Sequence, residues 1–177
     1  LAITFFTLLF LYYKARGLRT SITEYVPMKR ITKLITAVKN DPKIPFEATN
    51  LVFPTRSNSP NKLDSTVYHS LFKKRPRKAD VIWFLHLDIQ NEPWGVHYTV
   101  NEVIDKSCYY VSLQLGFKEE HHIEYMMRKI QGKMVEKNEL SGESIFESVR
   151  GSIDEVDFRF VVIKSRVSAD NDLTWFE

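Results

Sequence analysis

The sequence predicts an α/β fold, a sandwich in which helices cover a mixed, partly parallel sheet. Residues 81–89 (VIWFLHLDI) are nearly all apolar, which is typical of a central strand covered on both faces. A short apolar strand and a helical segment precede them, and the three elements form a β-α-β unit whose strands run parallel if they share a sheet. Residues 96–103 and 109–115 alternate apolar and polar side chains around a turn, which predicts an added antiparallel hairpin.

The chain starts with an apolar run, residues 1–13, that stops at Lys14, Arg16 and Arg19. A helix of that length reaches about 20 Å, whereas a bilayer core measures roughly 30 Å. Cations gather on the cytoplasmic side of membrane helices. We therefore expect residues 1–19 to be the end of the last transmembrane helix with its basic membrane exit. The alternatives are a buried core helix and a signal peptide, but the latter carries its positive charge before the apolar run.

Residues 20–45 are predicted to form an amphipathic linker helix. Between positions 28 and 38 the apolar residues recur at helical spacing, with Lys29, Arg30 and Lys33 between them. Such a basic face suits an anionic lipid surface, where each cation near the leaflet contributes about 1 kcal/mol. The equally good alternative is a surface helix that packs its apolar stripe on the following domain.

Residues 46–177 are predicted to be one cytosolic α/β regulatory domain. In chain order we expect a strand at 50–55, a polar loop at 56–61, a helix at 62–73, the central strand and the hairpin. A helix opening at Glu119 and Glu120 and a last strand at 158–164 follow. Cys108 is the only cysteine, so the sequence holds no disulfide framework and no cysteine cluster for zinc.

Catalytic and metal-binding patterns are missing from the sequence, and we expect neither an enzyme nor a cofactor. There is no G-x-S-x-G, H-E-x-x-H, G-x-x-x-x-G-K or G-x-G-x-x-G motif. His121 and His122 are adjacent and point about 100° apart on a helix, so a surface pair is expected. His86 lies in the central strand, where a hydrogen-bonded core histidine is the expected role.

Charge is distributed unevenly along the chain. Residues 1–78 contain 15 Lys or Arg and 4 Asp or Glu, while residues 79–177 contain 10 and 18. The first part therefore faces an anionic partner, such as lipid headgroups or a phosphate-bearing ligand. The stretch KKRPRK at 73–78 invites a nucleic-acid interpretation. We expect no nucleic-acid partner, because no aromatic residues alternate with these cations, which also have a routine role at a helix C-terminus.

Ligands of open α/β sheets lie beyond the carboxyl ends of the strands. In this sequence that edge would carry two loops, residues 56–61 and 90–94. The amino end of a helix starting near Lys62 would point to the same place and offer free N–H groups to an anion.

Five stretches resemble the cytosolic C-terminal region of the KUP/HAK/KT potassium uptake permeases, in the form found in Gram-positive bacteria. They are YVPMKRITKLI, IPFEATNLVFPTRS, FKKRPRKADVIWFLHLDIQNEPW, LQLGFKEE and DFRFVVI, and they occur in the family's order. LAITFFTLLFLYYKARGLR stands where the family has its last membrane helix. Pro54 and the loop RSNSPN depart from the family's pattern.

The resemblance implies a proton-coupled potassium importer in the cell membrane, with this region on the cytoplasmic side. Its partners would be the membrane part of the same transporter and a second copy in a homodimer. Some Gram-positive members are inhibited by cyclic di-AMP, and two phosphates suit cations and a helix N-terminus. The candidate ligand contacts are Arg56, Ser57, Asn58, Asn61, Lys62, Asn91 and Trp94. The alternative is a structural dimerisation and folding module that binds no small molecule.

Overall fold

A five-stranded sheet forms the centre of the molecule. The structure is a computed structural model that describes residues 2–21, 24–73, 75–137, 140 and 158–163. The strand order is β5-β6-β4-β2-β7. The bounds are β2 (Phe46–Thr55), β4 (Lys78–Gln90), β5 (Val96–Ile104), β6 (Cys108–Gly116) and β7 (Phe158–Phe160). All neighbours pair in parallel except β5 and β6, which confirms the predicted mixed α/β sheet with its antiparallel hairpin.

β4 is the central strand, as its apolar sequence predicted. Its residues Val81–Leu85 are buried because helices cover both faces of the sheet there. Beyond His86 the strand continues past the end of β2, and Asp88 and Ile89 are exposed. The second half of β4 therefore belongs to a protruding ribbon with β5 and β6, and not to the covered core.

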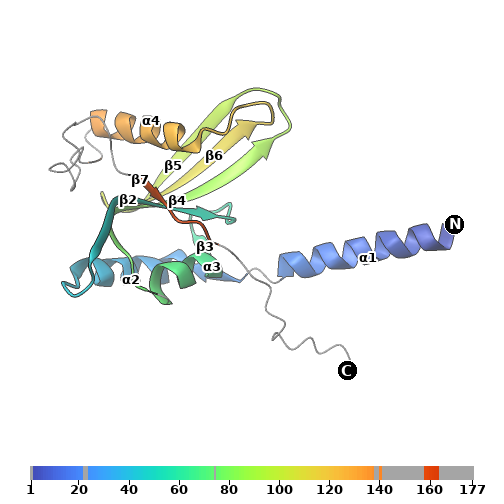
Figure 1. The fold of residues 1–177 in the computed structure, drawn as a ribbon, viewed down its shortest axis with the longest axis horizontal. Helices are drawn as coiled ribbons and strands as arrows, with labels where there is room; N and C mark the ends of the chain where they lie inside the picture. The colour runs from blue at the N-terminus through green and yellow to red at the C-terminus, as the bar shows by residue number, and fades with distance from the viewer. Residues whose placement is uncertain (1, 22–23, 74, 138–139, 141–157, 164–177) are drawn as a thin grey trace.

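One face of the sheet is covered by α2 (Met28–Asn40), α3 (Ser65–Tyr68) and the π-helical turn η1 (His69–Lys73), as Figure 1 shows below the strands. Met28, Ile31 and Ile35 are buried in a core that also contains Phe53 and Phe84 of the sheet. The apolar stripe of α2 is thus packed on the domain, which is the second of the two alternatives for this helix. Its cations remain outside.

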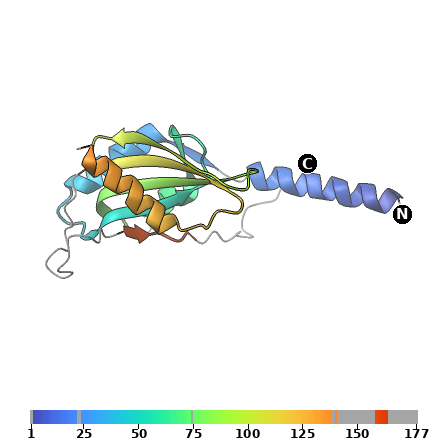
Figure 2. The ribbon, with the colours of Figure 1, turned by 90° about the horizontal axis from the view of Figure 1, so that it is seen from above.

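The opposite face of the sheet is covered by α4 (Ile123–Glu136), which crosses the strands (Figure 2). Met127, Ile130 and Met134 recur at helical spacing and pack on the second core, which includes Trp83 and Leu113. The molecule is therefore a three-layer sandwich, with one core on each side of the sheet.

Two helix starts were predicted wrongly. Lys62–Asp64 form a short strand, β3, which pairs antiparallel with β1 (Tyr25–Pro27). β1 is distant in the sequence, and its backbone supplies partners that local helical preference cannot match. α4 begins at Ile123, because Glu119 closes a turn whose backbone N–H donates to Gly116 (3.0 Å). The predicted strand 158–164 contains β7, but position 164 lies outside the described residues.

The first helix, α1, runs from Ala2 to Ser21. Its large apolar side chains are exposed, among them Phe5, Phe6 and Phe10. Among the described residues, none of the helices combines the length and hydropathy of a membrane span. The division of the chain at positions 19 and 45 stays a prediction.

Candidate functional site

The loop after β2 is organised by a buried carboxylate. Asp64 is 3% exposed, and its Oδ2 accepts hydrogen bonds from the Arg56 backbone N–H (2.7 Å) and the Thr55 hydroxyl (3.3 Å). The hydroxyl of Thr55 in turn accepts the backbone N–H of Ser57 at 3.1 Å. β3 carries Asp64 back toward the end of β2, so the loop between them closes on itself.

The first group of predicted contact residues divides by exposure. Arg56, Asn58, Asn61 and Lys62 are exposed, whereas Ser57 is fully buried. The Ser57 hydroxyl donates to the backbone carbonyl of Ser59 at 3.1 Å. A ligand approaching this loop from solvent therefore meets Arg56, Asn58, Asn61 and Lys62 before Ser57.

A cavity of about 200 Å³ lies beside this loop and is lined by Pro54, Thr55, Arg56, Asp64, Thr66 and Ile163. Its charged residues are one cation and one carboxylate. The predicted helix N-terminus at Lys62 is not there, because that residue belongs to β3 and α3 has only four residues. Free N–H groups of a long helix are therefore not part of this site.

Tyr110 lies in the core beneath this loop and is hydrogen-bonded to it. Its hydroxyl donates a 2.7 Å hydrogen bond to the backbone carbonyl of Ser57, and the residue is 1% exposed. Burial, followed by the negative charge of Asp64, raises the pKa of Tyr110 to about 12. The phenol therefore stays protonated and holds the loop at neutral pH.

The second group of predicted contact residues, Asn91 and Trp94, does not lie beside the loop after β2. Thr55 at the end of β2 pairs with His86, and β4 runs four residues further before its own loop begins. At about 3.3 Å per residue, this extension separates the two loops by roughly 13 Å along the strand direction. Both loops follow the carboxyl ends of parallel strands, as predicted, but they do not lie together, because β4 extends further than β2.

The loop at 91–95 has its own rigid anchorage. Backbone N–H groups of Gly116, Phe117 and Lys118 donate to the carbonyls of Gly95, Glu92 and Pro93 at 2.8, 3.0 and 2.9 Å, respectively. Trp94 is 63% exposed on this loop. It presents an apolar surface at the far end of the hairpin.

The histidines have the surroundings expected of non-catalytic residues. His86 Nδ1 lies 3.3 Å from the backbone carbonyl oxygen of Thr55. His121 and His122 are exposed, and His122 Nε2 lies 2.7 Å from a carboxylate oxygen of Glu120. Within the described ranges, no group of three or more His, Cys, Asp and Glu side chains is placed to hold a metal ion.

A cavity of about 730 Å³ lies between the start of α4 and the chain after β7. It is mainly apolar, with Leu85, Tyr125 and Phe160 among its lining residues. A second cavity, of about 320 Å³, lies at the amino edge of the sheet and contains Arg75, Arg77 and Arg159. Nothing in the sequence indicates that these three arginines lie together. KKRPRK signalled two of them, but no local pattern connects Arg159 to them.

Comparisons with known proteins give one consistent family. A family model described as "K+ potassium transporter C-terminal domain" matches residues 48–177. Proteins named "Probable potassium transport system protein Kup" are similar along nearly the whole chain. The one from Flavobacterium johnsoniae is 33% identical over 177 residues, which is 100% of this chain and 27% of that protein. The one from Cytophaga hutchinsonii is 33% identical over 170 residues (96% and 26%), and one from Clostridium perfringens is 26% identical over 173 (98% and 26%).

The chain spans about a quarter of the length of the curated relatives it matches. No solved structure matches it. The family model and the relatives are named for potassium transport, in agreement with the expectation of a transporter domain and not an enzyme. The matched region covers most of the chain, so the chain belongs to the KUP/HAK/KT family of potassium transporters, as its C-terminal domain.

Proposed function

We propose that this chain is the cytosolic regulatory and dimerisation domain of a proton-coupled potassium importer in the cell membrane. Membership of the transporter C-terminal family is the observation that carries this proposal. The relatives are about four times longer than the chain, so the ion pathway is assigned to the part of the transporter outside it. The domain then acts on transport from a distance.

The exposed apolar surface of α1 supports attachment to a membrane. Phe5, Phe6 and Phe10 are 63%, 72% and 61% exposed, and large exposed apolar surfaces mark contacts with lipid or with other proteins. Lys14 lies at the end of this surface and suits the cytoplasmic headgroup layer. Lipid or other helices of the transporter would cover α1.

Cyclic di-AMP is the proposed regulatory ligand, and its binding would lower potassium uptake. Arg56 and Lys62 are exposed cations near the cavity after β2 and suit phosphate, while Asn58 and Asn61 offer amide groups to adenine. The ligand's two-fold symmetry suits an isologous dimer, in which both copies supply the same residues. Asn91 and Trp94 would take part only through the second copy, because they lie too far along their own strand.

A structural module without a small-molecule ligand is the second candidate. One observation favours it: the backbone N–H groups of Arg56 and Ser57 and the carbonyl of Ser57 already have partners inside the protein. A loop of this kind keeps its shape without a ligand. Under this alternative the domain would dimerise and support folding of the transporter.

Calorimetric titration of the 177-residue chain with cyclic di-AMP tests the two candidates. Cyclic di-GMP, which carries the same two phosphates, serves as the comparison ligand, and Arg56→Ala and Asn58→Ala serve as site variants. Lys129→Ala, which removes an exposed cation of α4, is the matched control. We expect selective binding at half a ligand per chain, lost in the site variants and kept in the control. A dimer that gives no heat and no thermal stabilisation with cyclic di-AMP would support the structural module.

A further inference from the structure

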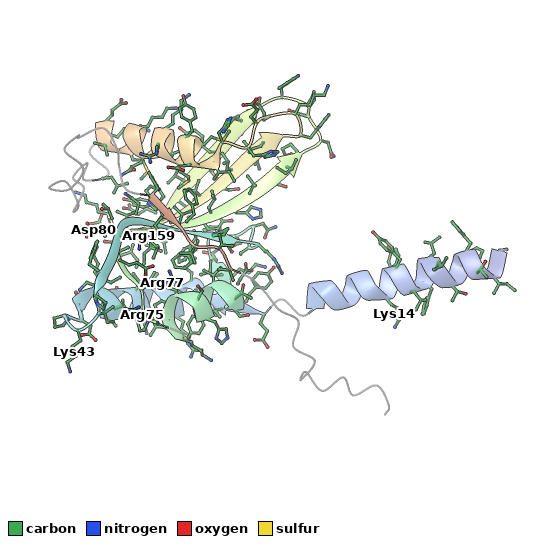
Figure 3. All side chains as sticks on the ribbon, in the orientation of Figure 1. Lys14, Lys43, Arg75, Arg77, Asp80 and Arg159 are labelled. Atoms are coloured by element: carbon green, nitrogen blue, oxygen red, sulfur yellow. The ribbon has the colours of Figure 1, made fainter. Side chains whose placement is uncertain are left out.

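Two arginines lie beside one carboxylate at the amino edge of the sheet, and a third lines the same cavity. Nη1 of Arg77 lies 2.7 Å from Oε1 of Glu47, and Nη1 of Arg159 lies 3.9 Å from the same oxygen. Arg75 lines the same cavity of about 320 Å³. Figure 3 shows Arg159, Arg77 and Arg75 one below another, at the end of the domain where β2 begins. They come from β7 and from the turn before β4.

The described lining of this cavity carries excess positive charge. Its described residues include three arginines and one carboxylate, and the others, Pro45, Phe46 and Pro76, are uncharged. Arg75 is exposed and forms no ion pair with any residue in the described part of the chain. These described residues would therefore attract an anion to the cavity.

The backbone that carries Arg75 and Arg77 is held in place before any ligand arrives. The backbone N–H of Arg77 donates to the carbonyl of Leu71 at 3.2 Å, which fixes the turn between η1 and β4. Pro76 restricts the same turn through its fixed φ. Next to Arg77, Nζ of Lys78 donates to the backbone carbonyl of Asp41 at 3.1 Å and ties the start of β4 to the segment that follows α2. Preorganised donors of this kind lose little entropy when a ligand binds.

We propose that this cavity binds the phosphate group of a soluble small molecule. Guanidinium groups match phosphate oxygens as planar, two-pronged donors, which is why arginine is preferred at phosphate sites. The cavity volume lies at the small end of the range for ligand sites. Its uncharged wall of Pro45, Phe46 and Pro76 offers contact to a ring attached to the phosphate, as in a nucleotide.

The position of the cavity favours a soluble source of phosphate over a lipid headgroup. α2 starts next to β1, where the chain arrives from α1, and ends at the 41–45 segment beside the cavity. Its 13 residues span about 20 Å, so the cavity lies at the other end of α2 from the α1 connection. This proposal does not depend on cyclic di-AMP or on the loop after β2.

Titration of the 177-residue chain with inorganic pyrophosphate and with AMP tests the proposal at low salt. The variants are Arg75→Gln and Arg159→Gln, both of which alter exposed side chains, and Lys129→Gln removes the same charge elsewhere. We expect each arginine variant to weaken binding about ten-fold or more, as the loss of a charged hydrogen bond does. The control should bind within about two-fold of the wild type, and added salt should weaken all binding.

Phosphatidylcholine vesicles with and without phosphatidylglycerol form the second arm of the experiment. α1 is identical in all variants, so a difference between wild type and Arg75→Gln reports on the cavity alone. If only phosphatidylglycerol vesicles distinguish the two proteins, the soluble ligand is excluded. An equal loss in Lys129→Gln, or no binding of pyrophosphate and AMP by a folded wild type, would also overturn the proposal.

Discussion

Asp64 shows how a single buried residue determines the shape of the candidate loop. Its Oδ2 accepts two hydrogen bonds from the end of β2, and no described group pairs with its Oδ1. A buried charge is stable only when it is hydrogen-bonded. Asp64 therefore holds the backbone of Arg56 in place, so that the exposed guanidinium of Arg56 starts from a fixed position.

Tyr110→Phe tests the contact beneath this loop. The variant loses the 2.7 Å hydrogen bond to the Ser57 carbonyl, and we expect its free energy of unfolding to fall by about 1 kcal/mol at neutral pH. Burial raises the pKa of Tyr110 from 10.0 to about 12. The phenol's contribution is therefore fully present below pH 10 and is lost as pH rises through 12.

Urea unfolding of wild type and variant across this alkaline range measures the difference. The stability gap between the two proteins should narrow as the pH rises. Tyr125→Phe is the control, because Tyr125 is 66% exposed, and it should show no gap at neutral pH. If the difference in stability between wild type and Tyr110→Phe stayed constant into strongly alkaline solution, the protonated phenol would not be the group that stabilises the loop.

At the scale of elements, β6 and α4 each contain a glycine, and the two positions differ in whether they have room for a side chain. A Cβ on Gly116 would lie 2.7 Å from the carbonyl oxygen and 2.8 Å from the carbonyl carbon of Pro93. That close approach lets the 91–95 loop dock on the end of β6. Gly132 lies on the exposed side of α4, and a Cβ there would meet nothing within 4 Å.

Gly116→Ala and Gly132→Ala should therefore change stability in opposite directions. Gly116→Ala pushes the backbone of Pro93 away from β6, and we expect it to lower the free energy of unfolding by about 1–3 kcal/mol. Gly132→Ala replaces a flexible residue of helix α4, and we expect it to raise the free energy of unfolding by about 0.5–1 kcal/mol. Thermal unfolding midpoints should shift by roughly 2–4 °C per kcal/mol for a chain of this size. Destabilisation of similar size by both alanines would refute the hairpin contact.

At the scale of the whole molecule, the sheet separates two cores that share its strands. Ile31 of α2 belongs to one core and Ile130 of α4 to the other. β4 and β6 supply side chains to both, because successive residues of a strand point to opposite faces. The layers are therefore expected to unfold together, although α2 and α4 do not touch through their buried side chains.

The single variants Ile31→Val and Ile130→Val and the double variant test whether the layers unfold together. Each removes one buried methylene group, at an expected cost of about 0.5–1.5 kcal/mol. The two sites lie on opposite sides of the sheet, so the costs should add within about 0.5 kcal/mol. Urea unfolding followed by circular dichroism and by tryptophan fluorescence should give one coincident transition in every variant. Separate transitions would mean that the layers unfold independently.

Local patterns in the sequence determined most of the sandwich. The apolar run at Val81–Leu85, the alternation in β5 and β6 and the helical spacing in α2 and α4 each depend on neighbours within about ten residues. Periodicity also identified the buried faces of α2 and α4, including Ile31 and Met127, whereas in β5 the alternating residues Val96 and Tyr98 are exposed. The resemblance in five ordered stretches led to the family that the comparisons then showed.

Only the tertiary structure decided which strands, loops and side chains contact one another. Lys62–Asp64 became a strand because β1 pairs with it, and Gln90–Trp94 moved away from Arg56 because β4 is longer than β2. Arg159 meets Glu47 and Arg77 because β7 joins the sheet beside β2, far from KKRPRK in the sequence. Periodicity reports which face of an element is buried, but strand partners and strand ends depend on contacts between distant residues. The sites of this domain depend on those contacts.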